Sequence, residues 1–145
     1  MSLVWPVWAF FDWLRLRQAR AKLSPEHALG VQGEDLAHRY LQRKGYRVVA
    51  RNWRSRRGLH EVDLMAWDGD RLVIVEVKTR RRDTFAAPER NVDAVKLRAL
   101  RAAARDYCRY REHLLASLRF DFIGIVIEPH LRIDHIEDAA ILFER

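Results

Sequence analysis

Two strand-like runs separated by a short turn constrain the fold of this chain most. The runs cover residues 60–67 and 71–79, and each alternates apolar with polar or charged side chains. That two-residue period is typical of a half-buried strand. The turn Asp68-Gly69-Asp70 lies between them, and a glycine next to an aspartate is a strong hairpin signal. The two runs are therefore predicted to form an antiparallel hairpin.

Four charged residues share one face of this hairpin, at positions two apart in each strand. They are Glu61, Asp63, Glu76 and Lys78. If the turn is Gly69-Asp70, Asp63 lies opposite Glu76, and the other two charged residues face each other. If the turn lies one residue earlier, Glu61 faces Glu76 instead and Asp63 becomes the diagonal neighbour. Val62, Leu64 and the valines of the second strand fall on the opposite face in both registers.

Two carboxylates on one face repel each other, by about 3 kcal/mol at 5 Å and an effective dielectric constant near 20. A bound cation reverses the sign, and oxygen ligands without thiolates suit Mg²⁺ or Mn²⁺, the metals of phosphate chemistry. The adjacent Lys78 could stabilise developing negative charge or orient a water molecule, and only four of the 27 basic residues are lysine. The alternative is a solvated sheet face on which Glu61 and Lys78 form a weak surface pair.

A fourth carboxylate comes from a helix predicted between Ser24, a good N-cap followed by proline, and Gly45. Glu34 lies three and seven residues before Ala37 and Leu41, so it points inward with the apolar face. A carboxylate on that face requires a partner or a metal. Small and apolar residues recur on this face, so the helix can approach a sheet closely: Gly30, Gly33, Ala37, Tyr40 and Leu41.

The remaining elements complete an α/β domain. Residues 46–53 form a strand before the hairpin, residues 80–88 form a basic loop, and residues 91–115 form a helix. This helix is predicted to turn one apolar face inward, with an arginine stripe beside it. The face consists of Val92, Val95, Ala99, Ala103 and Tyr107. Strands at 120–127 and 131–136 follow. The order α-β-β-β-α-β-β predicts a single domain, residues 24–145, with a central mixed sheet flanked by helices.

Charge and cysteine content narrow the partners and the compartment. The chain of 145 residues carries 27 Lys and Arg against 20 Asp and Glu, a net charge of +7, which favours a polyanionic partner, nucleic acid first. Its one cysteine, Cys108, excludes an internal disulfide and thiolate-built metal clusters, so a cytoplasmic location is expected.

Residues 1–23 differ from the rest, with aromatic residues crowded before a basic stretch. Such an extension could dock on a partner or a membrane surface, or be loosely ordered. The apolar segment Trp5 to Leu14 is too short to span a bilayer, so no membrane span is expected.

A family resemblance rests on four motifs, which cover about residues 30–127. They are Gly33-Glu34-Asp35-Leu36-Ala37, the run from Leu41 to Arg54, Glu61-Val62-Asp63-Leu64, and Val75-Glu76-Val77-Lys78-Thr79-Arg80. Together they resemble the YraN-like family of small bacterial proteins. That family is a branch of the PD-(D/E)XK nuclease superfamily, so the resemblance implies a restriction-endonuclease-like fold related to Holliday-junction resolvases.

By position, the resemblance implies that Asp63 and Glu76 are metal ligands, Lys78 the catalytic lysine and Glu34 the helix carboxylate of the site. Glu61 and Lys96 would be accessory groups. His60 departs from the glycine that is usual there, and it is either an additional ligand or a plain strand-edge histidine. A junction resolvase needs two active sites, so a homodimer is compatible with the resemblance, but the sequence identifies no dimer surface.

Two groups of arginines are expected to contact a nucleic-acid backbone near these carboxylates. They are Arg51, Arg54, Arg56 and Arg57 before the hairpin, and Arg80, Arg81 and Arg82 after it. Trp53 and Trp67 could stack on unpaired bases or pack in the sheet. The arginine stripe of the second helix, Arg98, Arg101, Arg105 and Arg109, is either a second phosphate track or a solvated face.

The sequence thus predicts a Mg²⁺- or Mn²⁺-dependent endonuclease acting on DNA, with branched or single-stranded DNA as the expected substrates. The alternative is a non-catalytic nucleic-acid-binding module of recombination, repair or DNA uptake. A third interpretation is an interaction adaptor anchored by its aromatic N-terminal extension.

Overall fold

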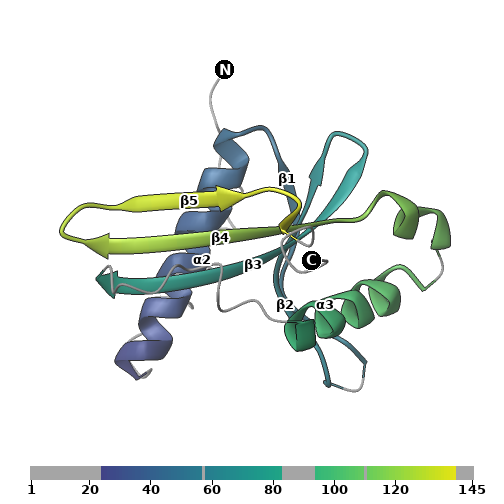
Figure 1. Cartoon of the computed structure of the whole chain (residues 1–145), viewed down its shortest axis with the longest axis horizontal. Coiled ribbons are helices and arrows are strands. Elements are labelled where there is room, and N and C mark those ends of the chain that lie inside the picture. Colours follow the sequence, from purple (N-terminus) through teal and green to yellow (C-terminus); the bar gives the residue numbers. More distant parts are fainter. Residues whose placement is uncertain (1–23, 57, 83–93, 110, 140–145) are drawn as a thin grey trace, which may run out of the picture.

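The computed structural model describes residues 24–56, 58–82, 94–109 and 111–139, and Figure 1 shows their arrangement. The elements are α2 (Pro25–Arg43), β1 (Arg47–Arg54), β2 (Glu61–Asp68), β3 (Arg71–Arg82), α3 (Ala94–Tyr107), a 3₁₀ helix η2 (Glu112–Ser117), β4 (Arg119–Glu128) and β5 (Arg132–Ile136). The predicted element order is confirmed. The predicted N-terminal extension lies outside the described residues.

One five-stranded sheet, in the order β1-β2-β3-β4-β5, forms the centre of the domain. Strands β3 and β4 are parallel, and every other neighbouring pair is antiparallel. A parallel pair needs a crossover connection, which α3 and η2 supply here. The sheet is therefore mixed, as predicted, and the fold is consistent with the restriction-endonuclease class.

The two helices cover opposite faces of the sheet (Figure 1). On one face, Ala37 and Leu41 of α2 pack against Val73 and Val75 of β3. On the other, Leu97 and Leu100 of α3 pack against Ile74. The resulting three layers enclose β3 and β4 on both faces, and β4 has the longer buried run.

Alpha helix α2 begins and ends as the sequence predicts. The side chain of Ser24 accepts a hydrogen bond from the backbone N–H of His27, at 3.3 Å. In its middle, α2 comes so close to β3 that a Cβ atom at Gly33 would overlap the side chain of Thr79. The small residue at position 33 thus lets the helix bring Glu34 to the sheet.

Two predicted element boundaries and one predicted buried face are wrong. β3 continues through Arg80 to Arg82 because its end pairs with β4, where Arg82 lies opposite Glu128, so these arginines belong to a strand and not to a loop. The second helix ends at Tyr107, and the chain then turns into η2. Its buried face is Leu97, Leu100, Ala103 and Ala104, whereas Val95 is 64% exposed.

The hairpin closes through Gly69-Asp70, since Asp68 lies opposite Arg71. Gly69 has a φ of 60°, a conformation that glycine adopts without steric cost. This selects the first of the two registers considered above. No helix among the described residues is long and apolar enough to cross a membrane.

Candidate active site

Asp63 and Glu76 form the centre of the site. The β2–β3 ladder runs from Asp68 opposite Arg71 to Leu64 opposite Val75, and one further step puts Asp63 across from Glu76. They are close enough that the negative charge of Glu76 raises the pKa of Asp63. The predicted juxtaposition of these two carboxyl groups is therefore present.

The strands separate where these carboxyl groups meet. The backbone N–H of Val77 donates to the Asp63 Oδ2, at 2.8 Å, and not to a β2 carbonyl. In β1, Asn52 lies opposite Asp63 and has a φ of 47°, which few residues other than glycine and asparagine tolerate. The two neighbours of Asp63 in β2 point to opposite faces of the sheet. Val62 packs in the core on the α3 side, and Leu64 packs in the core on the α2 side. The predicted strict alternation of β2 thus fails at Asp63.

Burial and the neighbouring carboxylate together favour the protonated form of Asp63. Burial raises the pKa of Asp63, the Glu76 charge raises it further, and the result is a pKa of about 7. The N–H of Val77 and the ammonium of Lys96 oppose this rise but do not reverse it. Two carboxyl groups so close cannot both ionise without a cost in free energy. A cation bound between them would remove that cost, so the pair is suited to hold one.

Glu76 has one engaged oxygen and one without a partner. Its Oε1 lies 3.0 Å from the Nζ of Lys96, on α3. Its Oε2 is enclosed, with no hydrogen-bond partner in the described part of the chain. A buried carboxylate oxygen without a partner is costly, and it is an oxygen donor positioned beside Asp63.

Glu34 faces the pair from α2 but does not join it. Its Oε2 accepts a hydrogen bond from the side chain of Asn52, at 2.9 Å, and lies 3.9 Å from the guanidinium of Arg51. Burial raises the pKa of Glu34, and the negative charge of Asp63 adds to that rise against the lowering effect of Asn52. The predicted inward orientation of Glu34 is present, with Asn52 as its partner.

Lys78 and Glu61 lie at the edge of the site. Lys78 is exposed on β3, two residues beyond Glu76, and the lysine that contacts the carboxylate pair is Lys96. Glu61 pairs across the strands with Arg54, at 3.3 Å, and both side chains are exposed. His60 donates its backbone N–H to Ser55, and its enclosed ring Nδ1 has no hydrogen-bond partner among the residues that the structure describes.

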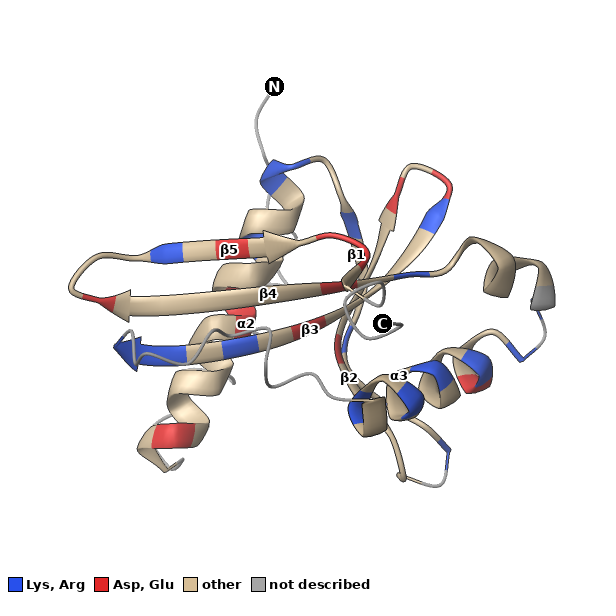
Figure 2. Ribbon diagram, in the orientation of Figure 1, with Lys and Arg blue, Asp and Glu red and all other residues tan. Residues whose placement is uncertain are grey.

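The predicted arginine groups divide by environment (Figure 2). Arg51 is half-buried against Asp35, at 2.7 Å, which ties β1 to α2. Arg81 and Arg82 both pair with Glu128, at 3.3 and 3.1 Å. Arg56 is exposed, whereas Arg57 lies outside the described residues. Only some of these cations are thus available to a ligand.

The two tryptophans pack rather than project. Trp53 packs against the α3-side core and meets Tyr107 edge-on, with ring centroids 5.6 Å apart. Trp67 packs beside Leu72 and Cys108. The packing interpretation of both is therefore confirmed.

The donor set suits a hard divalent cation. Among the described ranges, no group of three or more His, Cys, Asp or Glu side chains stands close enough to hold a metal ion. Magnesium needs fewer, because it keeps several waters and binds through one or two carboxylates plus substrate phosphate. Asp63 and the open oxygen of Glu76 supply that minimum.

Asn52 was not predicted as a site residue, although it contributes to the site in two ways. It takes the left-handed conformation beside Asp63, and its amide holds Glu34. Asparagine in the middle of an otherwise regular strand was the available signal, because asparagine is depleted in strands and tolerates positive φ.

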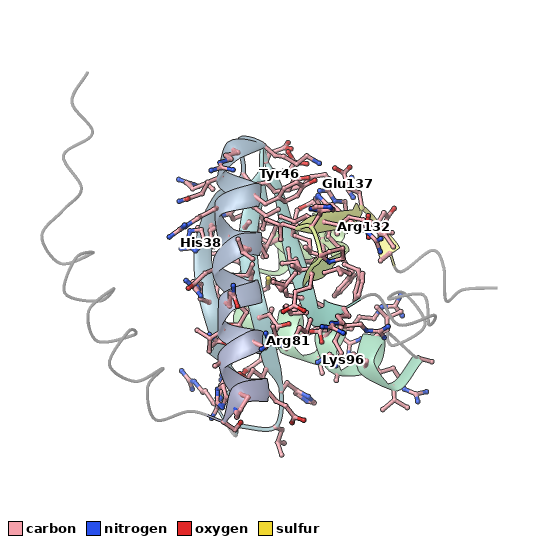
Figure 3. All side chains as sticks on the ribbon, turned by 90° about the vertical axis from the view of Figure 1, so that its left-hand side faces the viewer. His38, Tyr46, Arg81, Lys96, Arg132 and Glu137 are labelled. Carbon is pink, nitrogen blue, oxygen red and sulfur yellow. The ribbon has the colours of Figure 1, made fainter. Side chains whose placement is uncertain are left out.

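A second buried polar cluster, the Asp121 network, lies on the α2 side of the sheet. Arg119 donates to both oxygens of Asp121, at 2.8 and 2.9 Å, and to the hydroxyl of Tyr46, at 2.6 Å. The Nε2 of His135 lies 2.7 Å from Asp121. Figure 3 shows Tyr46 and Glu137 together near one end of the molecule and Lys96 away from them. The network joins β4 and β5 to the end of α2.

Comparison with known proteins identifies relatives over most of the chain. The profile of a family described as "Uncharacterised protein family UPF0102" matches residues 33–125. A UPF0102 protein of Solibacter usitatus is 46% identical over 125 residues, covering 86% of this chain and 92% of that protein. Others from Rhodococcus opacus and Geobacter sulfurreducens are 46% and 45% identical, each over 77% of this chain and over 95% and 87% of their own length.

These matches include the helix that carries Glu34, both strands of the carboxylate pair and α3. They also agree with the resemblance drawn from the four sequence motifs, since UPF0102 is the YraN-like branch of the PD-(D/E)XK nuclease superfamily. The chain therefore belongs to the UPF0102 family.

Proposed function

We propose that this protein is a metal-dependent endonuclease that hydrolyses DNA phosphodiester bonds, with branched or single-stranded DNA as its substrates. One observation carries the proposal: two carboxyl groups on adjacent strands lie against each other, and one buried oxygen of Glu76 has no partner among the described residues. Such a pair is destabilising without a ligand. One or two carboxylates of this kind are what a divalent cation requires to bind beside a phosphate.

Asp63 and Glu76 would hold Mg²⁺ or Mn²⁺. When bound, such a cation polarises a phosphodiester and lowers the pKa of a water molecule. The N–H of Val77 fixes one oxygen of Asp63, and Lys96 fixes one oxygen of Glu76, so both carboxylates are oriented before substrate arrives. Lys78 stands exposed on the same strand, where its ammonium can meet phosphate oxygens or an attacking water.

A second candidate is a non-catalytic nucleic-acid-binding module. The ion pair between Lys96 and Glu76 favours it, because an ammonium at 3.0 Å already balances the charge that a cation would balance. In that function the carboxylates would be structural, and the basic strands alone would contact the phosphates. For either function we propose a cytoplasmic location, which fits a chain with a single cysteine.

The test incubates the full chain with branched, single-stranded and duplex DNA in Mg²⁺, in Mn²⁺ and in a chelator. We expect metal-dependent cleavage that falls about 100-fold or more in Asp63→Asn, Glu76→Gln and Lys78→Ala. Asp134→Asn is the matched control, since it removes a carboxylate from an exposed ion pair on β5. Cleavage that survives all three site substitutions would refute the assigned site. Binding without cleavage under every metal condition would select the non-catalytic module.

A further inference from the structure

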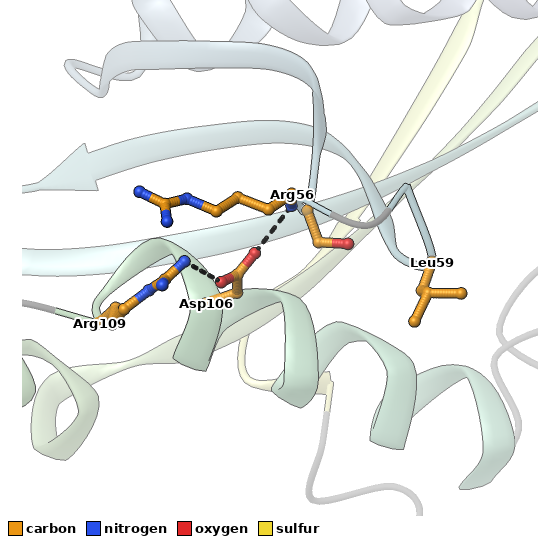
Figure 4. Close-up of a pocket in the computed structure, with 5 residues that line it drawn as sticks. Arg56, Leu59, Asp106 and Arg109 are labelled. Carbon is orange, nitrogen blue, oxygen red and sulfur yellow. Dashed lines mark hydrogen bonds and ion pairs between the residues drawn. The ribbon is translucent and has the colours of Figure 1, made fainter.

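A cavity of about 440 Å³ lies away from the carboxylate pair, between the β1–β2 connection and the end of α3. Five residues line it: Ser55, Arg56, Leu59, Asp106 and Arg109. Figure 4 shows Asp106 between the backbone of Arg56 and the side chain of Arg109, joined to each by a dashed line. We call this cavity the Arg56–Arg109 pocket.

Asp106 holds the two walls of the pocket together. Its Oδ2 accepts the backbone N–H of Arg56, at 3.1 Å, and its Oδ1 accepts from the Nη2 of Arg109, at 3.0 Å. The loop itself is closed by Ser55, whose backbone groups bond to His60 and Gly58. The pocket is therefore preformed, with both oxygens of its one carboxylate already engaged.

The lining favours an anion that carries an apolar part. Two guanidinium groups outnumber one carboxylate, and within the described ranges no hydrogen bond or ion pair engages the Arg56 guanidinium. Arginine is well suited to bind phosphate oxygens with two parallel hydrogen bonds. Leu59, 70% exposed at the rim, adds apolar surface. A phosphate attached to a sugar meets both requirements.

Helix α3 sets the spacing between the pocket and the proposed catalytic carboxylates. Lys96 contacts Glu76, and Asp106 follows ten residues later, about 15 Å along the helix axis at 1.5 Å per residue. One DNA strand advances 3.4 Å per nucleotide along its axis, so this distance spans about four to five nucleotides. Arg98 and Arg105 are exposed on the same helix. A nucleic-acid strand at the carboxylate pair can therefore reach the pocket.

We propose that the Arg56–Arg109 pocket binds a backbone phosphate of the nucleic acid, about four to five nucleotides from the bond held at the carboxylate pair. The proposal rests on the proposed function for its substrate class. It gives the protein a fixed second contact, which sets how much DNA must extend beyond the cleaved bond.

The first test measures affinity without chemistry, as fluorescence anisotropy of a labelled single-stranded 20-mer (about four times the predicted spacing) with the full chain in chelator. We expect Arg56→Gln to weaken binding about 5- to 10-fold and to lower the slope of log affinity against log salt by about 0.7, the value for one phosphate contact on a single strand. Arg56→Gln combined with Arg109→Gln should lower the slope by about 1.4. Arg39→Gln is the matched control, because it removes an exposed arginine from α2, on the opposite face.

The second test separates the pocket from the nuclease. With a cleavable substrate, the pocket variants should raise KM and leave kcat unchanged, whereas Asp63→Asn should abolish cleavage and keep the affinity of the 20-mer. If the 20-mer binds the double variant as tightly as it binds the Arg39→Gln control, the pocket proposal is wrong even where cleavage is observed. If binding falls as expected but no DNA is cleaved, the pocket stands and the nuclease proposal fails.

Discussion

Two buried aspartates in the same sheet have opposite environments. Asp121, on β4, is fully buried, and burial alone would raise its pKa, but hydrogen bonds from His135, Arg119 and the backbone N–H of Asp138 hold that pKa below its ordinary value. Asp63, on β2, faces another carboxylate, and its pKa rises to about 7. Asp121 has donors on both of its oxygens, whereas Asp63 has one backbone donor and another carboxylate beside it.

The difference separates a structural role from a functional one. Asp121 is ionised and surrounded by groups that need its charge, so the network stabilises the fold as long as it is complete. The carboxylate pair has fewer donors, the N–H of Val77 on Asp63 and the ammonium of Lys96 on Glu76, and one Glu76 oxygen has none among the described residues. We propose that a bound ligand offsets the cost of this incomplete satisfaction.

Breaking the Asp121 network should have the largest effect on stability. Asp121→Ala leaves Arg119 and His135 buried without their acceptor, so we expect a loss of about 3–5 kcal/mol in the free energy of unfolding, measured by urea denaturation. The control is Asp134→Ala, whose partner Arg132 is 49% exposed, and which should cost less than about 1 kcal/mol. Equal losses in the two variants would contradict the structural role.

Removing a charge from the carboxylate pair should increase the free energy of unfolding, whereas Asp121→Ala should decrease it. A pKa of about 7 in the folded chain, above the ordinary 3.8, means that ionisation of Asp63 costs folding stability as pH rises between these values. Asp63→Asn should therefore raise the free energy of unfolding at pH 8 by up to about 4 kcal/mol, with little gain at pH 4.

The check is urea denaturation at both pH values, beside Glu61→Gln, an exposed carboxylate that pairs with Arg54 and should change little. Destabilisation by Asp63→Asn at pH 8 would show that this carboxylate stabilises the fold as Asp121 does.

A smaller effect on stability is expected from a substitution in α2, at the point where the helix lies against β3. Gly33→Ala puts a methyl group into the side chain of Thr79, so α2 must shift from β3 at a cost of about 1–2 kcal/mol. Gly30→Ala is the matched control, since nothing lies near a Cβ there, and it should be neutral or stabilising by about 1 kcal/mol. Thermal denaturation of both variants makes the comparison, and equal melting temperatures would rule out the close approach.

Local patterns in the sequence predicted the element order and a group of carboxylates on one hairpin face, but they left two registers open, and the strand pairing in the structure decides that Asp63 and not Glu61 lies across from Glu76. They did not predict Asn52 as the partner of Glu34, or Lys96 as the lysine nearest Glu76, because both contacts join residues distant in the chain. The Asp121 network was also missed. It assembles side chains from β4, β5 and the end of α2, and no single segment carries its pattern.

The most direct test of the carboxylate pair as a metal site is Mn²⁺ binding to the full chain at pH 8, followed by electron paramagnetic resonance. We expect one Mn²⁺ site per chain. It should be lost in Asp63→Asn and in Glu76→Gln and kept in Asp134→Asn, because only the first two carboxylates face each other in the sheet. Binding that persists in both site variants, or no binding by the unmodified chain, would contradict this expectation.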